Sequence, residues 1–435
     1  MPRYLLTSLL IGGAVTVVIF ILYFVEAFEP MVRSLAGTYA TRGFFSGEAL
    51  LRVRWLEILL IAGLSMGVSW CVIDVSRPAM KIIIAIFIAL IAASLSPTLA
   101  FYNVLFDPFS SLAAVILSAI AGFAFAGTER GMRKRVLEDV LGHRVSDRTF
   151  CDLLNASTPP DFQGIDREVT VLTCRFLNLH ELQGTLQGAE LIKISNLFTR
   201  SVSSFLATKG AYLNETTPEF VEASFGLLQP QGNHAVAACR AALELRSRLR
   251  NLSQECESRW FQPLQFGIGI TSGKMTAGIY GAFGQFSFGG IGAVSDFSGR
   301  LARANADYGA DLLMSPITLL LTGEEFEVRP MDMLYDPEEG TLTEVYQLLA
   351  KRETFSDEDR QRRDLFWQGI IHLREKKYEA ALDCFSRARV PGTEDGPIAY
   401  FIGKSQDGVS VPEPKQSRLT RELTEEGHAR LISRM

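Results

Sequence analysis

Residues 167–172 read R-E-V-T-V-L, a β-branched run that is typical of a buried strand. Downstream, the sequence predicts a helix at about residues 189–209, a hairpin at residues 210–226, a second helix at residues 234–252 and a second strand at residues 264–270. Strands that alternate with helices predict an α/β or α+β domain in which helices pack on a sheet.

Other short segments lie around this run in a fixed order, and none of them is specific by itself. They are H-R-V-S at residues 143–146, A-S-F-G at 223–226, F-G-I-G-I-T-S-G at 266–273, I-G at 291–292 and R-L at 300–301. Taken together with their spacing, they make residues 140–349, about half of the chain, resemble the catalytic domain of class III adenylate and guanylate cyclases. The resemblance is to the bacterial membrane-anchored type, and it implies an α+β, ferredoxin-like cyclase homology domain over residues 161–351.

The resemblance also implies where metal ions should bind. In this family two aspartates hold ions that bridge the triphosphate and lower the pKa of the attacking ribose hydroxyl. Here the first position is Arg175, whose positive charge repels Mg²⁺, and the second is Glu219, which keeps a carboxylate with a longer reach. We therefore expect no two-metal site and no cofactor, with Mg²⁺ or Mn²⁺ relevant only to residual cyclase activity.

The nucleotide-binding positions that the resemblance implies are substituted as well. Glu215 stands where the family has an adenine-selecting lysine, Ala293 where it has an aspartate, and Asp296 where it has a ribose-orienting asparagine. Guanylate cyclases carry a glutamate at the position of Glu215, so this residue indicates either guanine recognition or an ordinary surface carboxylate.

Arg300 is the one catalytic position that matches the family, whose arginine stabilises charge on the phosphates. The alternative is a structural arginine that pairs with Asp296, four residues earlier on the same helix.

Three functions of the chain are compatible with the residues at the metal-binding, nucleotide-binding and catalytic positions. We expect a catalytically inactive domain that dimerises and regulates or scaffolds another protein; the alternatives are one half of a heterodimeric cyclase and an active adenylate or guanylate cyclase with unusual residues.

Composition separates a membrane part from a globular part. Hydrophobic residues make up 48% of the 435, mean hydropathy is +0.16, and the excess lies near the N-terminus. Four apolar segments are long enough to cross a bilayer, at about residues 4–25, 55–73, 82–100 and 110–126. Residues 1–127 are therefore predicted to form a transmembrane region, in which Asp107 and Pro108 begin the fourth helix.

Charge predicts the orientation and excludes one class of partner. Basic residues at 130–135 place the end of the fourth segment in the cytoplasm, so we expect a multi-pass protein of the inner membrane with a cytoplasmic cyclase-like domain. Four arginines in the first loop conflict with this orientation, unless the loop contains a re-entrant segment; they are Arg33, Arg42, Arg52 and Arg54.

The net charge of the chain is −5, which argues against nucleic acid as a partner. The six cysteines are dispersed along the sequence, which predicts reduced thiols.

Two segments are candidates for dimerisation. The connector at residues 128–160 carries an apolar stripe, Met132, Val136, Leu137, Val140 and Leu141, which indicates a helix that lies either on its own domain or against its twin. By family resemblance, the glycine-rich residues 278–292 form a hairpin in which Phe283, Phe286 and Phe288 could contact a homodimer or heterodimer partner.

The C-terminal part is predicted to be helical. Residues 358–404 show small and aromatic residues at the spacing of one tetratricopeptide-like pair of helices, which we expect to pack on the cyclase-like domain or to bind a protein partner. Residues 405–435 are polar and are expected to be a disordered tail.

Overall fold

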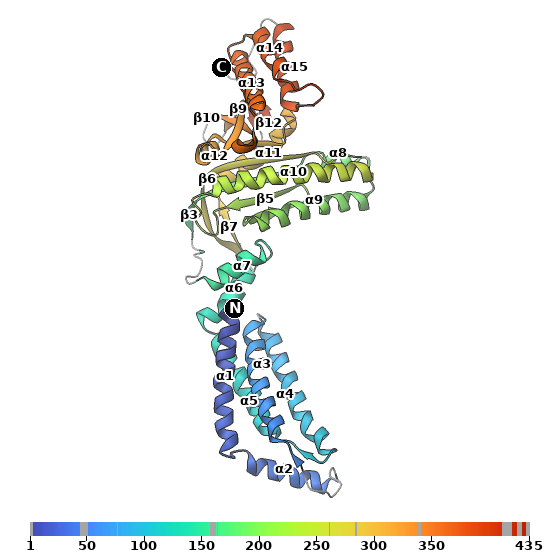
Figure 1. The fold of residues 1–435 in the computed structure, drawn as a ribbon, viewed down its shortest axis with the longest axis vertical. Helices are drawn as coiled ribbons and strands as arrows, with labels where there is room; N and C mark the ends of the chain where they lie inside the picture. The colour runs from blue at the N-terminus through green and yellow to red at the C-terminus, as the bar shows by residue number, and fades with distance from the viewer. Residues whose placement is uncertain are drawn as a thin grey trace. The chain divides into compact units, whose positions relative to one another are not determined.

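The computed structural model describes residues 3–43, 51–75, 77–156, 162, 164–260, 262–282, 285–336, 341–410, 420–423 and 429–431. The chain divides into two compact units (Figure 1). The first contains residues 1–140 and 150–159, and the second contains residues 141–149 and 160–435. We describe each unit by itself.

The N-terminal unit is a helix bundle whose long members coincide with the four predicted segments. They are α1 (Arg3–Phe24), α3 (Arg54–Asp74), α4 (Pro78–Ala100) and α5 (Pro108–Ala126). All four are long and apolar enough to cross a membrane. A further helix that the sequence did not predict, α2 (Glu29–Thr41), follows α1. Its 13 residues span about 20 Å, which is too short for a crossing.

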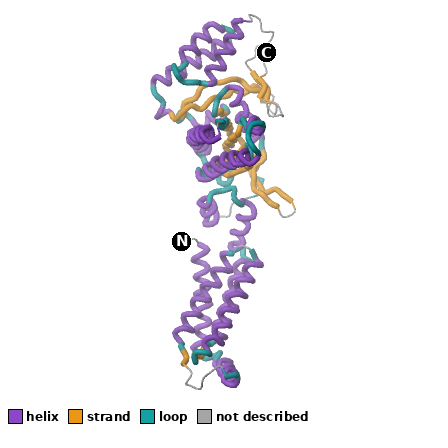
Figure 2. The backbone as a smooth tube through the Cα atoms, turned by 90° about the vertical axis from the view of Figure 1, so that its right-hand side faces the viewer, coloured by secondary structure: helices purple, strands orange, loops and turns teal. Residues whose placement is uncertain are grey.

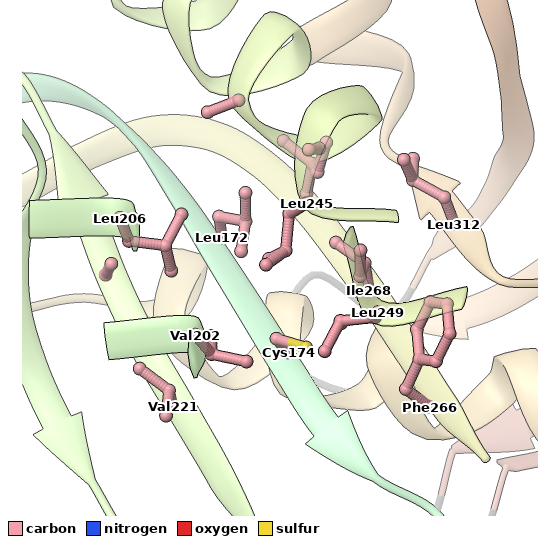
Figure 3. Close-up of a cluster of buried hydrophobic side chains, with 14 of the residues drawn as sticks. Leu172, Cys174, Val202, Leu206, Val221, Leu245, Leu249, Phe266, Ile268 and Leu312 are labelled. Carbon is pink, nitrogen blue, oxygen red and sulfur yellow. The ribbon is translucent and has the colours of Figure 1, made fainter. Parts of the chain in front are cut away.

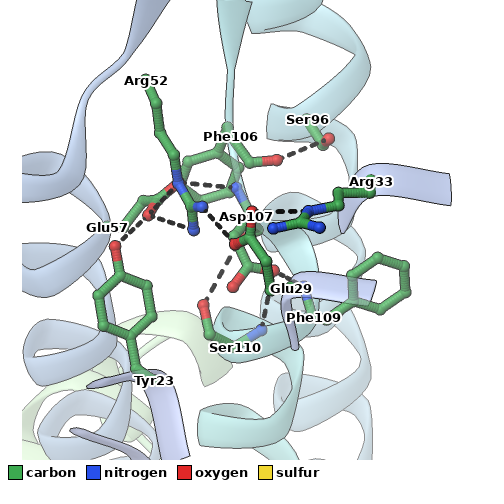
Figure 4. A network of polar contacts seen from close by, with 10 residues as sticks. All are labelled: Tyr23, Glu29, Arg33, Arg52, Glu57, Ser96, Phe106, Asp107, Phe109 and Ser110. Carbon is green, nitrogen blue, oxygen red and sulfur yellow. Dashed lines mark hydrogen bonds and ion pairs between the residues drawn. The ribbon is translucent and has the colours of Figure 1, made fainter. Parts of the chain in front are cut away.

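Polar residues cluster at the α2 end of this bundle (Figure 4). The Arg52 guanidinium donates to Glu29 Oε2 at 2.7 Å and to Glu57 Oε2 at 3.2 Å. The Glu57 carboxylate, which is fully buried, also accepts from the Tyr23 hydroxyl and from the Asp107 backbone N–H. Arg52 lies in the two-residue strand β1 (Leu51–Arg52), which pairs with β2 (Val104–Leu105). Arg33 Nε also donates to Glu29 Oε1 at 3.4 Å, so two of the four conflicting arginines pair with carboxylates.

The start of α5 agrees with the sequence prediction. Asp107 caps the helix, because its Oδ1 accepts from the backbone N–H groups of Phe109 at 2.8 Å and Ser110 at 3.3 Å. Pro108 occupies the first turn, where its missing N–H costs no hydrogen bond.

The C-terminal unit is built on a sheet, whose strands are orange in Figure 2. Along the sheet the strands follow the order β12-β11-β9-β10-β8-β6-β3-β5-β4. Its centre comprises β3 (Ile165–Phe176), α9 (Gly188–Thr208), β4 (Tyr212–Thr216), β5 (Phe220–Phe225), α10 (His234–Trp260) and β6 (Phe266–Ala282). This β-α-β-β-α-β succession with spatial order β6-β3-β5-β4 is the ferredoxin-like arrangement, which confirms the predicted fold class. The β6 strand extends 12 residues beyond the predicted end and pairs with β7 (Gln285–Ile291) in a long hairpin.

One face of the sheet carries the main hydrophobic core (Figure 3). Side chains that alternate along β3, such as Leu172 and Cys174, pack with Val202 of α9 and with Leu245 of α10. Because side chains in a strand alternate between faces, the intervening Thr173 and Arg175 point to the opposite face. That face is covered by α11 (Ala293–Tyr308).

Two glycines of β6 allow α11 to approach this sheet closely. A Cβ atom at Gly267 would overlap the Ala302 carbonyl oxygen, and one at Gly269 would overlap the Ser298 carbonyl oxygen. The Ser298 hydroxyl also lies 2.6 Å from the Thr173 hydroxyl of β3. This close packing determines where the later residues of α11 project.

The remaining strands and helices complete the unit. They are α8 (Leu179–Gln183), β8 (Leu312–Met314), α12 (Pro316–Thr322), β9 (Phe326–Asp336), β10 (Thr341–Lys351), a 3₁₀ turn (Arg352–Thr354), α13 (Asp357–Arg374), α14 (Tyr378–Ala388), α15 (Gly396–Ser410), β11 (Thr420–Leu423) and β12 (Ala429–Leu431).

The C-terminal helices pack on the sheet through a second core. Phe366 of α13, Phe385 of α14 and Phe401 of α15 join Leu301 and Tyr308 of α11 in this core. There are three helices where the sequence predicted a pair, and α15 continues to Ser410 with Ser405 fully buried, so the polar tail begins later than predicted. Residues 411–419, 424–428 and 432–435 of the predicted tail lie outside the described residues.

The connector contains two helices separated by Gly142, whose φ of 52° is left-handed. They are α6 (Glu129–Leu141) and α7 (Asp147–Asn155). Of the predicted stripe, Leu137, Val140 and Leu141 are buried, whereas Met132 and Val136 are exposed. Only the two exposed residues remain free for a partner helix.

Candidate functional site: an ion pair at the implied metal positions

The two residues at the implied metal positions bind each other. Arg175 lies at the end of β3, and Glu219 lies in the turn that precedes β5. Arg175 Nη2 donates to Glu219 Oε2 at 2.8 Å, and the guanidinium carbon lies 5.6 Å from the centre of the Phe220 ring. The Phe176 N–H donates to the Glu219 carbonyl oxygen at 2.7 Å, which holds the turn against β3. A cation of the protein itself therefore occupies the place next to the remaining carboxylate.

This donor set does not fit a two-metal site. Divalent ions of the magnesium type need several oxygen ligands, and Arg175 offers none. On the short helix α8, His180 Nε2 lies 3.8 Å from Glu219 Oε1, the carboxylate oxygen that Arg175 does not bind. The His180 side chain is largely exposed. Within the described ranges, no group of three or more His, Cys, Asp or Glu side chains is placed to hold a metal ion.

The substituted nucleotide-binding positions lie on neighbouring elements. Glu215 is exposed on β4, and Ala293 and Asp296 are exposed in the first turn of α11. Between them is Glu222 of β5, which the sequence analysis did not single out. Burial raises the pKa of the Glu222 carboxyl, and the charges of Glu215 and Asp296 raise it further.

Glu222 is held by two donors on the α11 side of the sheet. Its carboxylate accepts from Asn214 Nδ2 at 2.7 Å and from Ser295 Oγ at 2.5 Å. The only sequence signal for this residue was a charge in the otherwise apolar run of β5, at a position whose neighbours Val221 and Ala223 face the core. Three carboxyl groups thus gather near the N-terminus of α11.

Arg300 and Arg303 lie one turn apart on α11, further from its N-terminus. Neither guanidinium has a carboxylate within 4.0 Å among the described residues, so Arg300 does not form the predicted pair with Asp296. Arg303, which sequence reasoning missed, is half-buried. Burial lowers the pKa of its guanidinium, and the positive charge of Arg175 lowers it further.

The predicted contact hairpin is only partly available for contact. Phe288 is buried, with its ring centre 5.5 Å from that of Tyr212 and 5.4 Å from that of Phe162, so it does not contribute to a partner surface. Phe286 is half exposed as predicted, and Ile279, Tyr280 and Ile291 add exposed apolar surface that the sequence analysis did not name. Phe283 lies outside the described residues.

Comparison with solved structures gives matches to nucleotide cyclases. The chain is similar to the guanylyl cyclase Cya2, at 20% identity over 44% of this chain and 97% of that one, with a TM-score of 0.40. It is also similar to the adenylyl cyclase CyaB from P. aeruginosa, at 21% identity over 45% of this chain and 100% of that one, with a TM-score of 0.41. At identities of 20% and 21%, these matches concern the fold alone.

Curated sequences match part of the chain. No family model matches the chain. The uncharacterized proteins Rv1319c of Mycobacterium tuberculosis and Mb1353c of Mycobacterium bovis are each 26% identical to it over 165 residues, which is 38% of this chain. The match spans 29% of the length of each relative.

Proposed function

We propose that this chain is a membrane-anchored signalling protein whose cyclase-like domain has lost catalysis and acts as a dimerising regulatory or scaffold module. The observation that carries the proposal is the Arg175–Glu219 ion pair. A metal ion bound to Glu219 would have to displace a guanidinium held at 2.8 Å and would then lie beside its positive charge. The four apolar helices support a membrane anchor, and we place the cyclase-like domain in the cytoplasm on the charge rule.

The test is cyclic-nucleotide formation by the full-length chain in detergent. With ATP or GTP and either Mg²⁺ or Mn²⁺, we expect no cyclic AMP or cyclic GMP above a protein-free blank. Arg175→Asp should not restore turnover, because Ala293 and Asp296 remain at the nucleotide-binding positions. Turnover that disappears in Glu219→Ala would overturn the proposal, since it would require Glu219 to act as a metal ligand.

A second function is favoured by one observation. Arg300 is partly exposed and has no carboxylate within 4.0 Å among the described residues, so it could be lent to the metal site of a related chain in a heterodimer. Co-expression with a related cyclase chain that lacks its own corresponding arginine tests this. Cyclic-nucleotide formation that depends on Arg300 would replace the scaffold role by that of a heterodimer subunit.

A further inference from the structure

A lysine is buried at the end of the helix bundle where α3 ends and α4 begins. Lys81 lies one turn into α4 and is only 7% exposed. It shares a helical face with Ile88 and Ala92, two and three turns further along α4. Ala92 is buried, and Ile88 packs on the core that α3 and α5 form. The Lys81 side chain therefore faces the interior of the bundle.

The Lys81 ammonium lacks a partner. In the part of the chain that the structure describes, it has no carboxylate within 4.0 Å and no hydrogen-bond acceptor. The charges that act on it from nearby are those of Arg135 and Lys134 of α6, and both are positive. A buried charge without a partner is costly, and an ionisable residue inside a membrane helix normally has a functional partner. An anion would supply what the protein does not.

Two further cations are held at the same end of the bundle by direct contacts. Lys134 Nζ donates to the Asp74 carbonyl oxygen at 2.8 Å and to Asp74 Oδ1 at 2.9 Å, which ties α6 to the last residue of α3. Arg77 directly precedes α4 and is exposed, and its carbonyl oxygen accepts from the Lys81 backbone N–H at 3.2 Å. Of these three cations, Asp74 balances one.

We propose that Lys81, Lys134 and Arg77 form a site for the phosphate of an anionic phospholipid headgroup. The inference rests on the membrane anchor and the orientation in the proposed function, which place this end of the bundle at the cytoplasmic surface. The Lys81 Cα atom lies about 5 Å along α4 from its first residue, so the long side chain can extend to the level of the headgroups. Basic pockets between membrane helices on this side are suited to anionic headgroups.

A phosphodiester also fits the chemistry of the pocket. The ammonium group has three N–H donors and no acceptor, and phosphate oxygens accept such bonds without a further charge from the protein. Because Lys134 belongs to α6, a lipid bound here would also hold the connector helix to the bundle.

The experiment is native mass spectrometry on the full-length chain in a neutral detergent, with dioctanoyl phosphatidylglycerol as the probe. We expect this lipid to bind more tightly than dioctanoyl phosphatidylcholine, whose choline cancels the phosphate charge. Lys81→Gln should weaken phosphatidylglycerol binding about tenfold, because it removes a charged donor. Lys81→Arg keeps the charge and should stay within about threefold of the unmodified chain. The matched control, Lys193→Gln at an exposed position of α9, should change the affinity less than about twofold.

A gain of affinity protects the test from variants that merely misfold. Asp74→Asn removes the carboxylate that competes for the Lys134 ammonium. Phosphatidylglycerol should then bind about threefold more tightly.

Three results would overturn the proposal: equal binding of the two lipids, Lys81→Gln binding like the unmodified chain, or an equal affinity for glycerol 3-phosphate, which would replace the lipid by a soluble phosphate. Cyclic-nucleotide formation and recovery in the membrane fraction are measured for the same chain. A chain that fractionates with membranes, shows no turnover and does not bind the lipid contradicts this inference alone. Turnover, or recovery in the soluble fraction, contradicts the proposed function instead.

Discussion

At the scale of single residues, the notable feature of this chain is a set of largely buried charged side chains that are held in ion pairs. Arg175 stands at the end of β3, and the Glu219 carboxylate binds its guanidinium at 2.8 Å. The second core contains a comparable case. Arg329 of β9 donates to both oxygens of Asp395, at 2.9 and 2.7 Å, and its guanidinium carbon lies 4.5 Å from the centre of the Phe366 ring. These contacts hold the C-terminal helices to the sheet.

Asp332 of β9 gives a pH prediction at this scale. Its carboxyl is buried, with Lys404 Nζ at 3.3 Å, and burial raises its pKa to about 6. The unfolded value is about 3.9. The folded chain therefore binds more protons between about pH 4 and 6, and the contribution of Asp332 to stability falls as the pH rises through that window.

Asp332→Asn should remove this loss. The variant should match the unmodified chain near pH 4, where Asp332 is protonated, and should be more stable by up to about 3 kcal/mol at pH 7. Thermal unfolding midpoints of both proteins from pH 4 to 7 check the prediction. A difference that stays constant across this range would show that Asp332 does not titrate as described.

At the scale of elements, α11 packs closely on β6. Because Gly267 and Gly269 carry no side chain, the helix backbone lies directly on the strand, and the Thr173–Ser298 hydroxyl contact ties it to β3. The same closeness brings the first turn of α11 to Glu222 through Ser295.

Gly269→Ala tests this packing. The added methyl group would overlap the Ser298 carbonyl oxygen, which is backbone and cannot move aside without moving the helix. We expect a loss of about 1–3 kcal/mol in unfolding free energy, measured by chemical denaturation in detergent. The matched control is Gly299→Ala on α11, where a Cβ atom meets nothing within 4 Å, and which should be neutral or stabilising by up to about 1 kcal/mol. Equal effects of the two substitutions would contradict the role given to Gly269.

At the scale of the whole molecule, the β6–β7 hairpin is an exposed apolar arm. Tyr280, Phe286 and Ile291 are each at least half exposed on it, at 50%, 50% and 75%. Apolar surface of this kind on a two-stranded arm favours contact with another chain. We propose that it contributes to a homodimer, or to a heterodimer with a related chain, while a protein partner at the C-terminal helices remains a separate proposal.

We predict that the full-length chain sediments as a dimer at micromolar concentration in detergent. Phe286→Asp should shift it toward monomer, because it places a charge in the proposed contact. Leu320→Asp, on the exposed surface of α12 at 81% exposure, is the control and should leave the dimer unchanged. A chain that sediments as a monomer at every concentration would exclude this dimer.

Membrane topology is the last prediction at this scale. With four crossings and the cyclase-like domain inside, α2 lies outside the cell. A cysteine introduced at the exposed Ser34 of α2, in a chain with Cys151→Ser, should react with an impermeant maleimide on intact cells. A cysteine at the exposed Ser258 of α10 should react only after the cells are opened. Protection of position 34 in intact cells would mean an odd number of crossings.

The four long helices and the ferredoxin-like order could be predicted because the signals are local. Apolar runs of about 20 residues, β-branched strands and the Asp107–Pro108 helix start each depend on neighbours in the sequence. The assignment of positions 175, 219 and 293 to the catalytic positions of the family follows from spaced motifs in the sequence, and it stays a prediction. The third C-terminal helix and the burial of Phe288 were missed, since both depend on a distant surface against which to pack.

Sequence alone therefore determined which residue types stand at the implied catalytic positions. The tertiary structure decided which partners the side chains of those residues contact. Spacing indicated a pair between Arg300 and Asp296, but α11 leaves Arg300 without a carboxylate within 4.0 Å in the described chain. Arg175 instead finds Glu219, 44 residues away, because β3 and β5 pair in a register that opposes Arg175 to Phe220. Partners of a charge are set by distances in space, which strand register and helix packing establish after local structure has formed.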